Sequence, residues 1–369
     1  MKLQIDHRDL VRALGSITSV VEQRVTMPIL SHILLKAEKD QVVLTATDME
    51  MEVAITLAAK IEKAGEGTLP ARKLHDIIRK LPPGEITLES KDDSCAVRSG
   101  RAKFDLRMLA PTDFPQLSAT NMPCSFTLSA EHTRTLLGRT TFAMSQDDSR
   151  YYLGGLSVQK RSEKESGVLQ VAATDGHRLA VTRLAYQEKG EPLPNIIIPR
   201  KTVTLLSHLL EGNDEDVQIS AGEGSIQFVL AGATMTSKLI DGQYPDYERV
   251  IPNDNDQQAT INREEFVHII DRVATVVSDQ SRAIKIALAE KTMIVSASDE
   301  EQNHGIEETS LDYAGQNLEI GFNARYILDV AKAVQADDMV LRFKDPTSPC
   351  LILDPGDDQT QYVVMPLRI

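Results

Sequence analysis

A segment that occurs three times constrains the fold of this chain more than any other feature. It is an apolar run that ends in Thr or Ser and then Asp: LTATDMEMEV at residues 44–53, VAATDGHRLAV at 171–181 and VSASDEEQNH at 295–304. The three aspartates, Asp48, Asp175 and Asp299, are 127 and 124 residues apart. A period of this length corresponds to a whole domain rather than to a solenoid unit. The sequence therefore predicts three similar domains in tandem.

The length and the linkers indicate where these domains meet. A chain of 369 residues accommodates three domains of roughly 120 residues each. The segments ATNMPCS, near residue 122, and IPNDNDQQ, near residue 256, are rich in proline, asparagine and aspartate, as linkers are. We predict domains at residues 1–122, 123–255 and 256–369.

Each third opens with a short alternating strand that ends in a helix-capping residue, Asp6, Ser129 or Asn262. An amphipathic helix follows at once, and a second one comes later in the same third. The predicted helices are residues 8–17 and 71–81, then 130–139 and 199–210, then 263–273 and 323–334.

Between the two helices of each third, alternating apolar and polar residues predict antiparallel strands. The paired runs are residues 27–38 with 41–48, residues 151–159 with 168–175, and residues 283–290 with 292–299. The aspartate that closes each pair is typical of an Asx turn. The expected fold class is α+β, with two helices backed by about eight strands in antiparallel sheets in every domain.

Composition argues against several kinds of protein. A formal net charge of −14 argues against a protein that binds nucleic acid non-specifically over its whole surface. One basic face is still compatible with this net charge. The scattered Cys95, Cys124 and Cys350 indicate neither a disulfide framework nor a metal cluster, and they fit a reducing cytoplasm. No run approaches the roughly 18 apolar residues of a membrane-spanning helix. We expect no metal, no cofactor and no membrane association.

The number of helices bears on assembly. Six helices packed side by side in a ring leave no hole, whereas twelve surround an opening of roughly 24 Å, enough for a nucleic-acid duplex. A head-to-tail dimer supplies twelve. Basic residues accumulate on the helices of the first two thirds, and a plain solvated face is the competing interpretation. They are Arg12, Arg72, Lys73, Arg79, Lys80, Arg134, Arg139, Arg200 and Lys201.

Seven segments, in this order, make the chain resemble the bacterial β sliding clamp family, the processivity subunit of DNA polymerase III. They are TLPARK (68–73), SRYYLGG (149–155), ATDGHRLAV (173–181), IIPRK (197–201), SKLIDGQYPDYERVIP (237–252), IGFNARYILDV (320–330) and YVVMPLRI (362–369). The resemblance covers the full length. It implies a homodimeric ring of six similar domains that slides on duplex DNA, with no catalytic activity and no cofactor.

The resemblance also implies partners and a DNA-facing surface. The DNA polymerase III alpha subunit, the clamp loader, other polymerases and mismatch-repair proteins are expected to bind through short linear motifs. Arg and Lys contact phosphates without reading sequence, so such binding depends on salt and permits sliding. The residues expected to contact the duplex are Arg24, Arg72, Lys73, Gln146, Arg150, Tyr151, Tyr152, Arg200 and Lys201. For the two tyrosines, the competing interpretation places one in the core and one on the surface.

A peptide-binding pocket is implied at the middle copy of the repeated turn. Only that copy carries Gly-His-Arg, and the chain ends on the apolar segment MPLRI, which suits peptide capture. A satisfied, partly buried histidine is the competing interpretation of His177. The expected lining is Leu153, Thr174, Gly176, His177, Arg178, Leu179, Pro245, Arg249, Val250, Val363, Met365, Pro366, Leu367 and Arg368.

The dimer seam implied by the resemblance joins the first domain to the third domain of a partner. Phe104 and Leu106, beside Arg101 and Lys103, are expected to face Val276 and Val277. Acidic residues are expected to meet the basic pair and to set the register of the seam: Glu300, Glu301, Glu307 and Glu308. Ordinary strand core is the competing interpretation of Phe104 and Leu106.

Two other function classes compete with the clamp: an enzyme, and a scaffold that collects peptides without DNA. The sequence contains no GxxxxGK[ST] phosphate loop and no HExxH helix, and AGEGSIQ lacks the third glycine of a dinucleotide fingerprint. Asp175 and His177 are two residues apart on a turn, with no serine or cysteine nucleophile indicated by spacing. Salt-sensitive retention on circular but not linear duplex separates the clamp from both alternatives.

Overall fold

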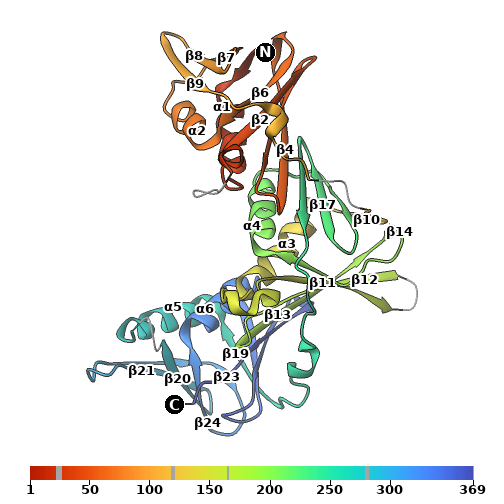
Figure 1. Ribbon diagram of the computed structural model, residues 1–369. Coiled ribbons are helices and arrows are strands. Elements are labelled where there is room, and N and C mark those ends of the chain that lie inside the picture. The colour runs from red at the N-terminus through yellow and green to blue at the C-terminus, as the bar shows by residue number, and fades with distance from the viewer. Residues whose placement is uncertain (22–26, 118–120, 164–165, 279–281, 369) are drawn as a thin grey trace. The chain divides into compact units, whose positions relative to one another are not determined.

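The computed structural model describes residues 1–21, 27–117, 121–163, 166–278 and 282–368. Within these residues the elements form three consecutive groups, each of nine strands and two α-helices (Figure 1). The helices are α1 (His7–Ile17), α2 (Ala71–Ile78), α3 (Ala130–Thr140), α4 (Arg200–Leu209), α5 (Arg263–Val273) and α6 (Ala324–Ala333). The six predicted helices and the α+β class are confirmed, with nine strands in each group where about eight were expected.

The strands of each group follow the predicted alternation. The first group contains β1 (Lys2–Asp6), β2 (His32–Glu38), β3 (Gln41–Thr47), β4 (Met51–Ala58), β5 (Lys60–Lys63), β6 (Gly65–Pro70), β7 (Glu85–Lys91), β8 (Ser94–Ser99) and β9 (Ala102–Arg107). The second contains β10 (Cys124–Leu128), β11 (Gly155–Glu163), β12 (Ser166–Thr174), β13 (Arg178–Tyr186), β14 (Glu188–Gly190), β15 (Ile196–Pro199), β16 (Val217–Ala221), β17 (Ser225–Leu230) and β18 (Ala233–Lys238). The third contains β19 (Gln257–Asn262), β20 (Ala283–Ala289), β21 (Thr292–Ser298), β22 (His304–Ser310), β23 (Asp312–Tyr313), β24 (Leu318–Asn323), β25 (Asp338–Phe343), β26 (Cys350–Asp354) and β27 (Asp357–Val364).

Two predicted strand runs instead begin with a 3-10 helix, Pro28–Ser31 before β2 and Asp148–Leu153 before β11. Pro28 has no backbone N–H to give to a sheet and its fixed φ suits the first helical position. Asp147 caps the second 3-10 helix by accepting the N–H of Ser149 (3.0 Å). The extended conformation therefore starts later in both runs than alternation alone predicts.

The predicted capping residues open three of the helices. Their side-chain oxygens accept backbone N–H groups of the first turn: Asp6 from Arg8 and Asp9 (2.7 and 3.3 Å), Ser129 from His132 (3.1 Å), and Asn262 from Glu265 (3.1 Å). These bonds satisfy donors that a helix start leaves unpaired. Two of the repeated aspartates form the expected turns: Asp48 accepts from Glu50 and Met51, and Asp175 from His177 and Arg178. Asp299 accepts from Asn303, four residues on.

Two of the four antiparallel sheets continue from one group into the next. One runs β14-β10-β16-β17-β18-β4-β3-β2-β6, joined where β18 pairs with β4, and the other runs β15-β11-β12-β13-β27-β26-β25-β19-β23, joined where β13 pairs with β27. The remaining sheets are shorter, β5-β1-β7-β8-β9 and β22-β21-β20-β24. They end on β9 and β22.

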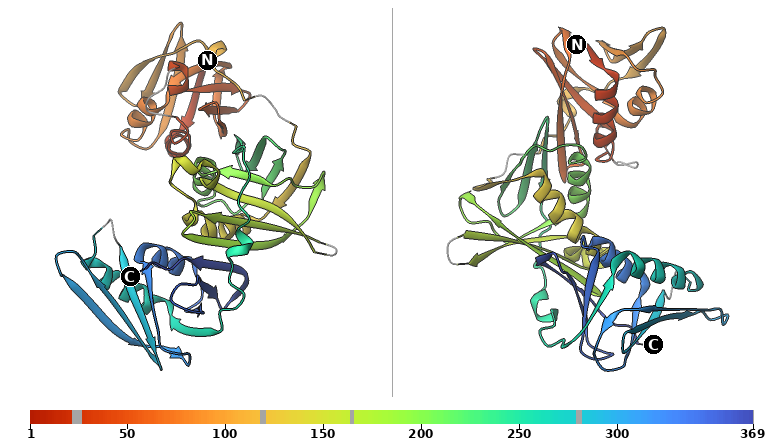
Figure 2. Two further views of the ribbon diagram at one scale, coloured as in Figure 1. Left: turned by 60° about the horizontal axis from the view of Figure 1, so that its bottom comes forward. Right: turned by 180° about the vertical axis from the view of Figure 1, so that it is seen from behind.

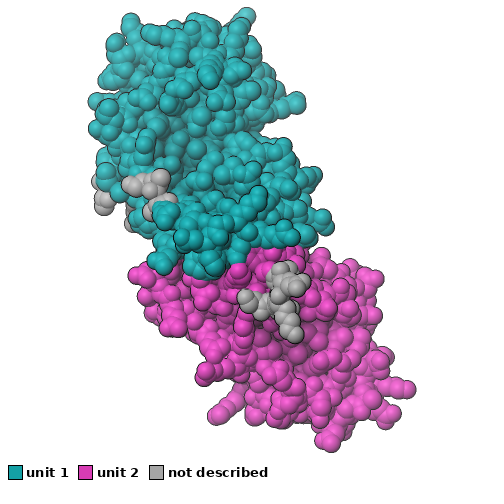
Figure 3. Space-filling view, turned by 90° about the vertical axis from the view of Figure 1, so that its right-hand side faces the viewer, with its two compact units in different colours: residues 1–134, 187–194, 201–239 teal, residues 135–186, 195–200, 240–369 magenta. Residues whose placement is uncertain are grey.

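The described chain forms two compact units (Figure 3). Unit 1 comprises residues 1–134, 187–194 and 201–239, and unit 2 comprises residues 135–186, 195–200 and 240–369, so the second group contributes to both. In unit 1, α1 packs beside α2, and in unit 2, α5 packs beside α6 (Figures 1 and 2). Each helix buries one apolar stripe, as Leu10, Leu14 and Ile17 do on α1. No helix in the described ranges has the length and apolar character needed to cross a membrane.

Candidate functional site

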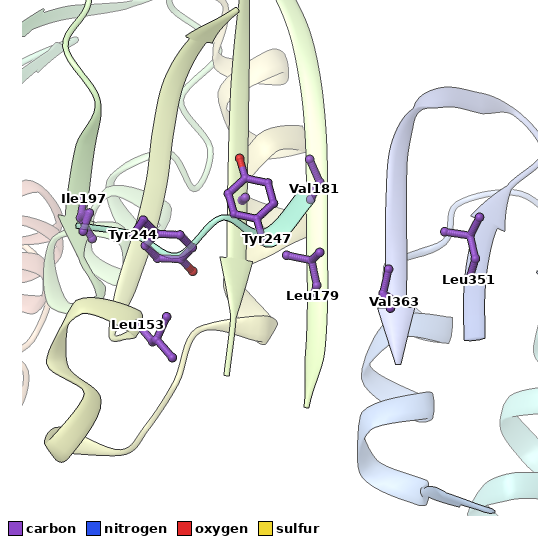
Figure 4. Close-up of a cluster of buried hydrophobic side chains, with 9 residues drawn as sticks. Leu153, Leu179, Val181, Ile197, Tyr244, Tyr247, Leu351 and Val363 are labelled. Atoms are coloured by element: carbon purple, nitrogen blue, oxygen red, sulfur yellow. The ribbon is translucent and has the colours of Figure 1, made fainter. Parts of the chain in front are cut away.

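A buried apolar cluster in unit 2 contains Leu153, Leu179 and Val363, three of the residues predicted to line the floor of a peptide pocket (Figure 4). Leu179 on β13 lies opposite Val363 on β27, because these strands join the two halves of the sheet. Tyr244 and Tyr247 cover them from the segment after β18, and the Tyr244 hydroxyl accepts the N–H of Thr174 (2.9 Å). The whole cluster is Leu153, Ala172, Leu179, Val181, Ile197, Tyr244, Tyr247, Leu351 and Val363.

The rim above this floor comes from the Asp175 turn and the end of the chain. The N–H of Met365 donates to the carbonyl of His177 (2.8 Å), and the N–H of Leu367 donates to that of Gly321 (2.8 Å). These bonds hold the apolar C-terminal segment against the turn, with Met365 and Val250 36% and 45% exposed. The other exposed residues of the predicted set are Gly176, His177, Pro245, Arg249 and Arg368, while Pro366 and Leu367 are half-buried.

Arg178 lies beneath this surface, contrary to the expectation that it lines the pocket. It is 7% exposed, and its guanidinium donates to Asp175 (3.0 Å), to Asp329 on α6 (2.6 Å) and to the carbonyl of Phe142 (2.5 Å). Its Cζ also lies 4.6 Å from the ring centroid of Tyr326. Because these donors are satisfied inside unit 2, Arg178 fastens α6 to the turn and supports the pocket from below.

His177 is exposed, so the competing interpretation as a satisfied, partly buried histidine is wrong. Its ring stacks on Tyr326, with centroids 6.0 Å apart and planes 16° apart. Sequence reasoning missed Tyr326, whose pKa is raised by burial. A signal was present: the residue after the matching Arg72 and Arg200 is Lys73 or Lys201, whereas after Arg325 it is a tyrosine. A repeat copy that changes from lysine to tyrosine has changed its surface chemistry.

A cavity of about 300 Å³ borders the same segment but is a different feature. Of the predicted pocket residues it contains only Pro245. Its walls include an ion pair between Arg161 and Glu248. Behind them, the buried Gln170 donates to the hydroxyl of Tyr247, which is also a wall residue (2.8 Å). These contacts brace the tyrosine that covers the apolar floor.

The residues predicted to contact DNA occur in both units. Arg72, Lys73 and Lys201 are exposed in unit 1, as are Gln146 and Tyr151 in unit 2, whereas Arg150, Tyr152 and Arg200 are half-buried. Arg24 lies outside the described residues. Some of the positive charge is already offset, because Lys201 forms an ion pair with Asp48, Arg150 with Asp147 (3.0 Å), and Arg139 with Asp357 (2.6 Å).

The two tyrosines differ, in agreement with the competing interpretation. Tyr151 is 58% exposed, whereas Tyr152 packs against the apolar cluster of the pocket. The rings contact edge to face, with centroids 5.7 Å apart. Tyr152 therefore packs into the apolar interior of unit 2, and Tyr151 lies on the surface.

The predicted seam residues lie on two sheet edges. Phe104 on β9 is 38% exposed, but Leu106 is 6% exposed, so the expectation that Leu106 faces a partner is wrong: the core of unit 1 already covers it. On the other edge, Ile306 on β22 is 63% exposed and was missed. Glu307 is engaged by Arg272 (3.0 and 2.5 Å) within unit 2.

The other seam residues are spread around these edges. Arg101 and Lys103 are exposed, with Lys103 in an ion pair with Asp105 (3.0 Å). Glu300 and Glu301 are exposed in the turn before β22. The two valines at the end of α5, Val276 and Val277, are half-buried.

Comparison with known proteins identifies the family. Residues 1–118, 127–246 and 248–368 match the N-terminal, central and C-terminal domains of the DNA polymerase III beta subunit. Proteins named beta sliding clamp from Caulobacter vibrioides (strain NA1000 / CB15N) and Escherichia coli (strain K12) are 39% and 34% identical, over 100% of both chains in each case. The crystal structure of a sliding clamp (DNA polymerase III subunit beta) from Bartonella birtlesii bound to griselimycin has a TM-score of 0.95 at 39% identity, over 100% of both chains. The corresponding Pseudomonas aeruginosa structure with griselimycin has a TM-score of 0.94 at 36% identity, again over 100% of both chains. The chain belongs to the DNA polymerase III beta subunit family, the sliding clamps that act as processivity factors.

Proposed function

We propose that two copies of this chain form a ring that encircles duplex DNA and slides on it in the cytoplasm. The pocket over Leu153, Leu179 and Val363 would tether the DNA polymerase III alpha subunit, the clamp loader, other polymerases and mismatch-repair proteins. Their short motifs would place apolar side chains on this floor and beside Met365, which adapts to varied shapes. The role consists of binding and needs no catalytic step or cofactor.

The observation that carries the ring is the unequal division of the sheets. Each nine-stranded sheet is a five-stranded half joined to a four-stranded half, through β18 with β4 or through β27 with β13. The other two sheets are an unjoined five-stranded half that ends on β9 and an unjoined four-stranded half that ends on β22. Exposed edge strands present unpaired backbone groups. A second copy that pairs β9 with β22 would complete a third sheet of the same kind, twice over in a two-fold dimer.

The joined sheets also give the register of this seam. Phe104 is equivalent to Met235 and Tyr362, because each pairs with a core residue of the strand before it. The pairs are Phe104 with Val97, Met235 with Phe228 and Tyr362 with Ile352. Met235 lies opposite Val53 on β4, and Tyr362 lies opposite Ala180 on β13. The residue of β22 equivalent to Val53 and Ala180 is Gly305. A side chain at Gly305 would approach Val276 within 3.3 Å, so the glycine leaves this space to the ring of Phe104.

Light scattering and DNA retention test the proposal. We expect a mass of about twice 40.7 kDa and retention on circular but not linear duplex, weakening as salt rises. A monomer at all concentrations would refute the ring. A dimer that binds partner peptides but is not retained on circular DNA would favour a peptide-collecting scaffold instead.

A further inference from the structure

Unit 1 contains a cavity of about 240 Å³ beside the first repeated turn. It lies where β18 joins β4, with the Phe114-Pro115 segment on one side. Its lining combines hydroxyl groups with an apolar rim in which Met49 is 44% exposed. The lining residues are Thr47, Met49, Pro115, Gln116, Leu117, Ser225, Thr236, Ser237 and Lys238.

The backbone around this cavity repeats that of the proposed peptide pocket. The Thr47 hydroxyl donates to the carbonyl of Met51 (2.9 Å), as the Thr174 hydroxyl donates to that of Arg178 (2.6 Å). The N–H of Lys238 donates to the carbonyl of Glu50 (2.8 Å), as that of Met365 donates to His177 (2.8 Å). The strand that follows the turn pairs in the same register, Glu52 with Thr236 and Leu179 with Val363.

Because of this equivalence, five of the nine lining residues occupy positions of the predicted peptide pocket. Thr47, Met49 and Pro115 stand where that pocket has Thr174, Gly176 and Pro245. Thr236 and Lys238 stand where it has Val363 and Met365. The backbone is therefore arranged alike at both joined seams.

The chemistry of the two hollows differs. Glu52 replaces Leu179 and Thr236 replaces Val363, so the apolar pair is lost; Thr236 lines the cavity, and Glu52 is its partner on β4. The Glu52 carboxylate accepts the N–H of Leu117 (3.2 Å), and burial raises the pKa of this carboxyl. Asp48 is engaged by Lys201 and Glu50 by Lys238, whereas Glu52 forms no ion pair in the part of the chain that the structure describes.

We propose that this cavity is a second docking pocket, which takes an extended peptide segment with an apolar side chain next to a basic one. The inference rests on the proposed peptide pocket as its template. The apolar side chain packs on Met49, Pro115 and Leu117, and the basic group supplies the missing charge partner of Glu52. Because the two floors differ, the segments that bind here differ from those that bind the first pocket.

Methionine-methyl NMR of the full-length protein tests both pockets in one spectrum, since Met49 reports on this cavity and Met365 on the first pocket. The protein is first saturated with griselimycin and then titrated with acetyl-Ala-Leu-Arg-Ala-amide or with the same peptide carrying Glu in place of Arg. We expect griselimycin to shift the Met365 signal and the Arg peptide to shift the Met49 signal saturably. Glu52→Gln should raise the Kd for the Arg peptide by about threefold to fivefold. Glu38→Gln, which removes the same charge from β2, should not.

The outcomes separate the two proposals. A Met49 signal that stays unmoved, or that responds equally to the Arg and Glu peptides, overturns the second pocket. So does an Arg-peptide affinity unchanged by Glu52→Gln. A Met365 signal unmoved by griselimycin counts against the first pocket instead, whatever Met49 does.

Discussion

Removal of the Phe104 ring tests the proposed subunit seam most directly. A phenylalanine side chain buries about 200 Å² when fully covered, and Phe104 is 38% exposed. A partner strand would therefore cover about 75 Å² more, which corresponds to about 2 kcal/mol at 25 cal/mol per Å². With two such seams in a ring, Phe104→Ala should weaken the dimer by about 4 kcal/mol, or nearly a thousandfold in Kd.

The assay is sedimentation equilibrium over a dilution series of the full-length protein. Met49→Ala is the matched control, because Met49 is 44% exposed and belongs to neither β9 nor β22. A second variant, Gly305→Val, fills the space that Phe104 is proposed to occupy and should weaken the dimer as well. Chemical denaturation of each variant at low concentration separates loss of dimer from loss of fold.

Two results would refute this reasoning. One is a Phe104→Ala protein that remains folded and dimerises as tightly as the original chain. The other is an equal loss of dimer in Met49→Ala, which would mean that exposed apolar area in general, rather than the seam, controls the mass.

Three further predictions concern DNA, the pocket and pH. The double substitution Arg72→Ala and Lys73→Ala should lower the salt concentration at which the protein releases circular DNA. It should also reduce the slope of the logarithm of the binding constant against the logarithm of salt concentration by about two. Arg178→Leu removes the ion-pair partner of the buried Asp175, leaves Asp329 only its longer contact with Arg325 (3.8 Å), and should cost about 3 kcal/mol in urea unfolding. Burial lowers the pKa of His32, so the folded state favours the neutral ring. The resulting stability is fully present above the usual histidine pKa of about 6.5 and is lost as pH falls towards the folded value. His32→Gln should flatten that part of a denaturation series between about pH 7 and pH 5.

Local signals explain why so much of the fold could be predicted from the sequence. The capping side chains of Asp6, Ser129 and Asn262 act within three residues of their own position, and the apolar period lies within single helices and strands. The errors at Pro28–Ser31 and Asp148–Leu153 are also local, because a short 3-10 turn has too few residues to display a period.

The site depends on contacts that no local pattern contains. Arg178 meets Asp329 across 151 residues of sequence, and Tyr326 completes that arrangement from the same helix. Phe104 and Leu106 have the same parity on one strand, so alternation assigns both to the same face. Only the packing of unit 1 shows that Leu106 is covered by its own core, whereas Phe104 stays partly exposed.

The seams between repeats explain how one fold acquires separate tasks. On one face, the residues equivalent to Phe104 are buried under the neighbouring strand, with Met235 at 0% and Tyr362 at 1% exposure, and we expect the same burial of Phe104 in the proposed seam. On the other face, the paired positions are Leu179 with Val363 at one seam and Glu52 with Thr236 at the next. In the register proposed for the subunit seam, the same pair is His304 with Asp105. The first face serves cohesion and tolerates only apolar residues, whereas the second is free to vary. We expect apolar residues on that second face at the seam that binds an apolar motif, and an acidic residue at the seam that binds a basic segment. We expect ion-pairing residues at the seam that binds another copy of the chain.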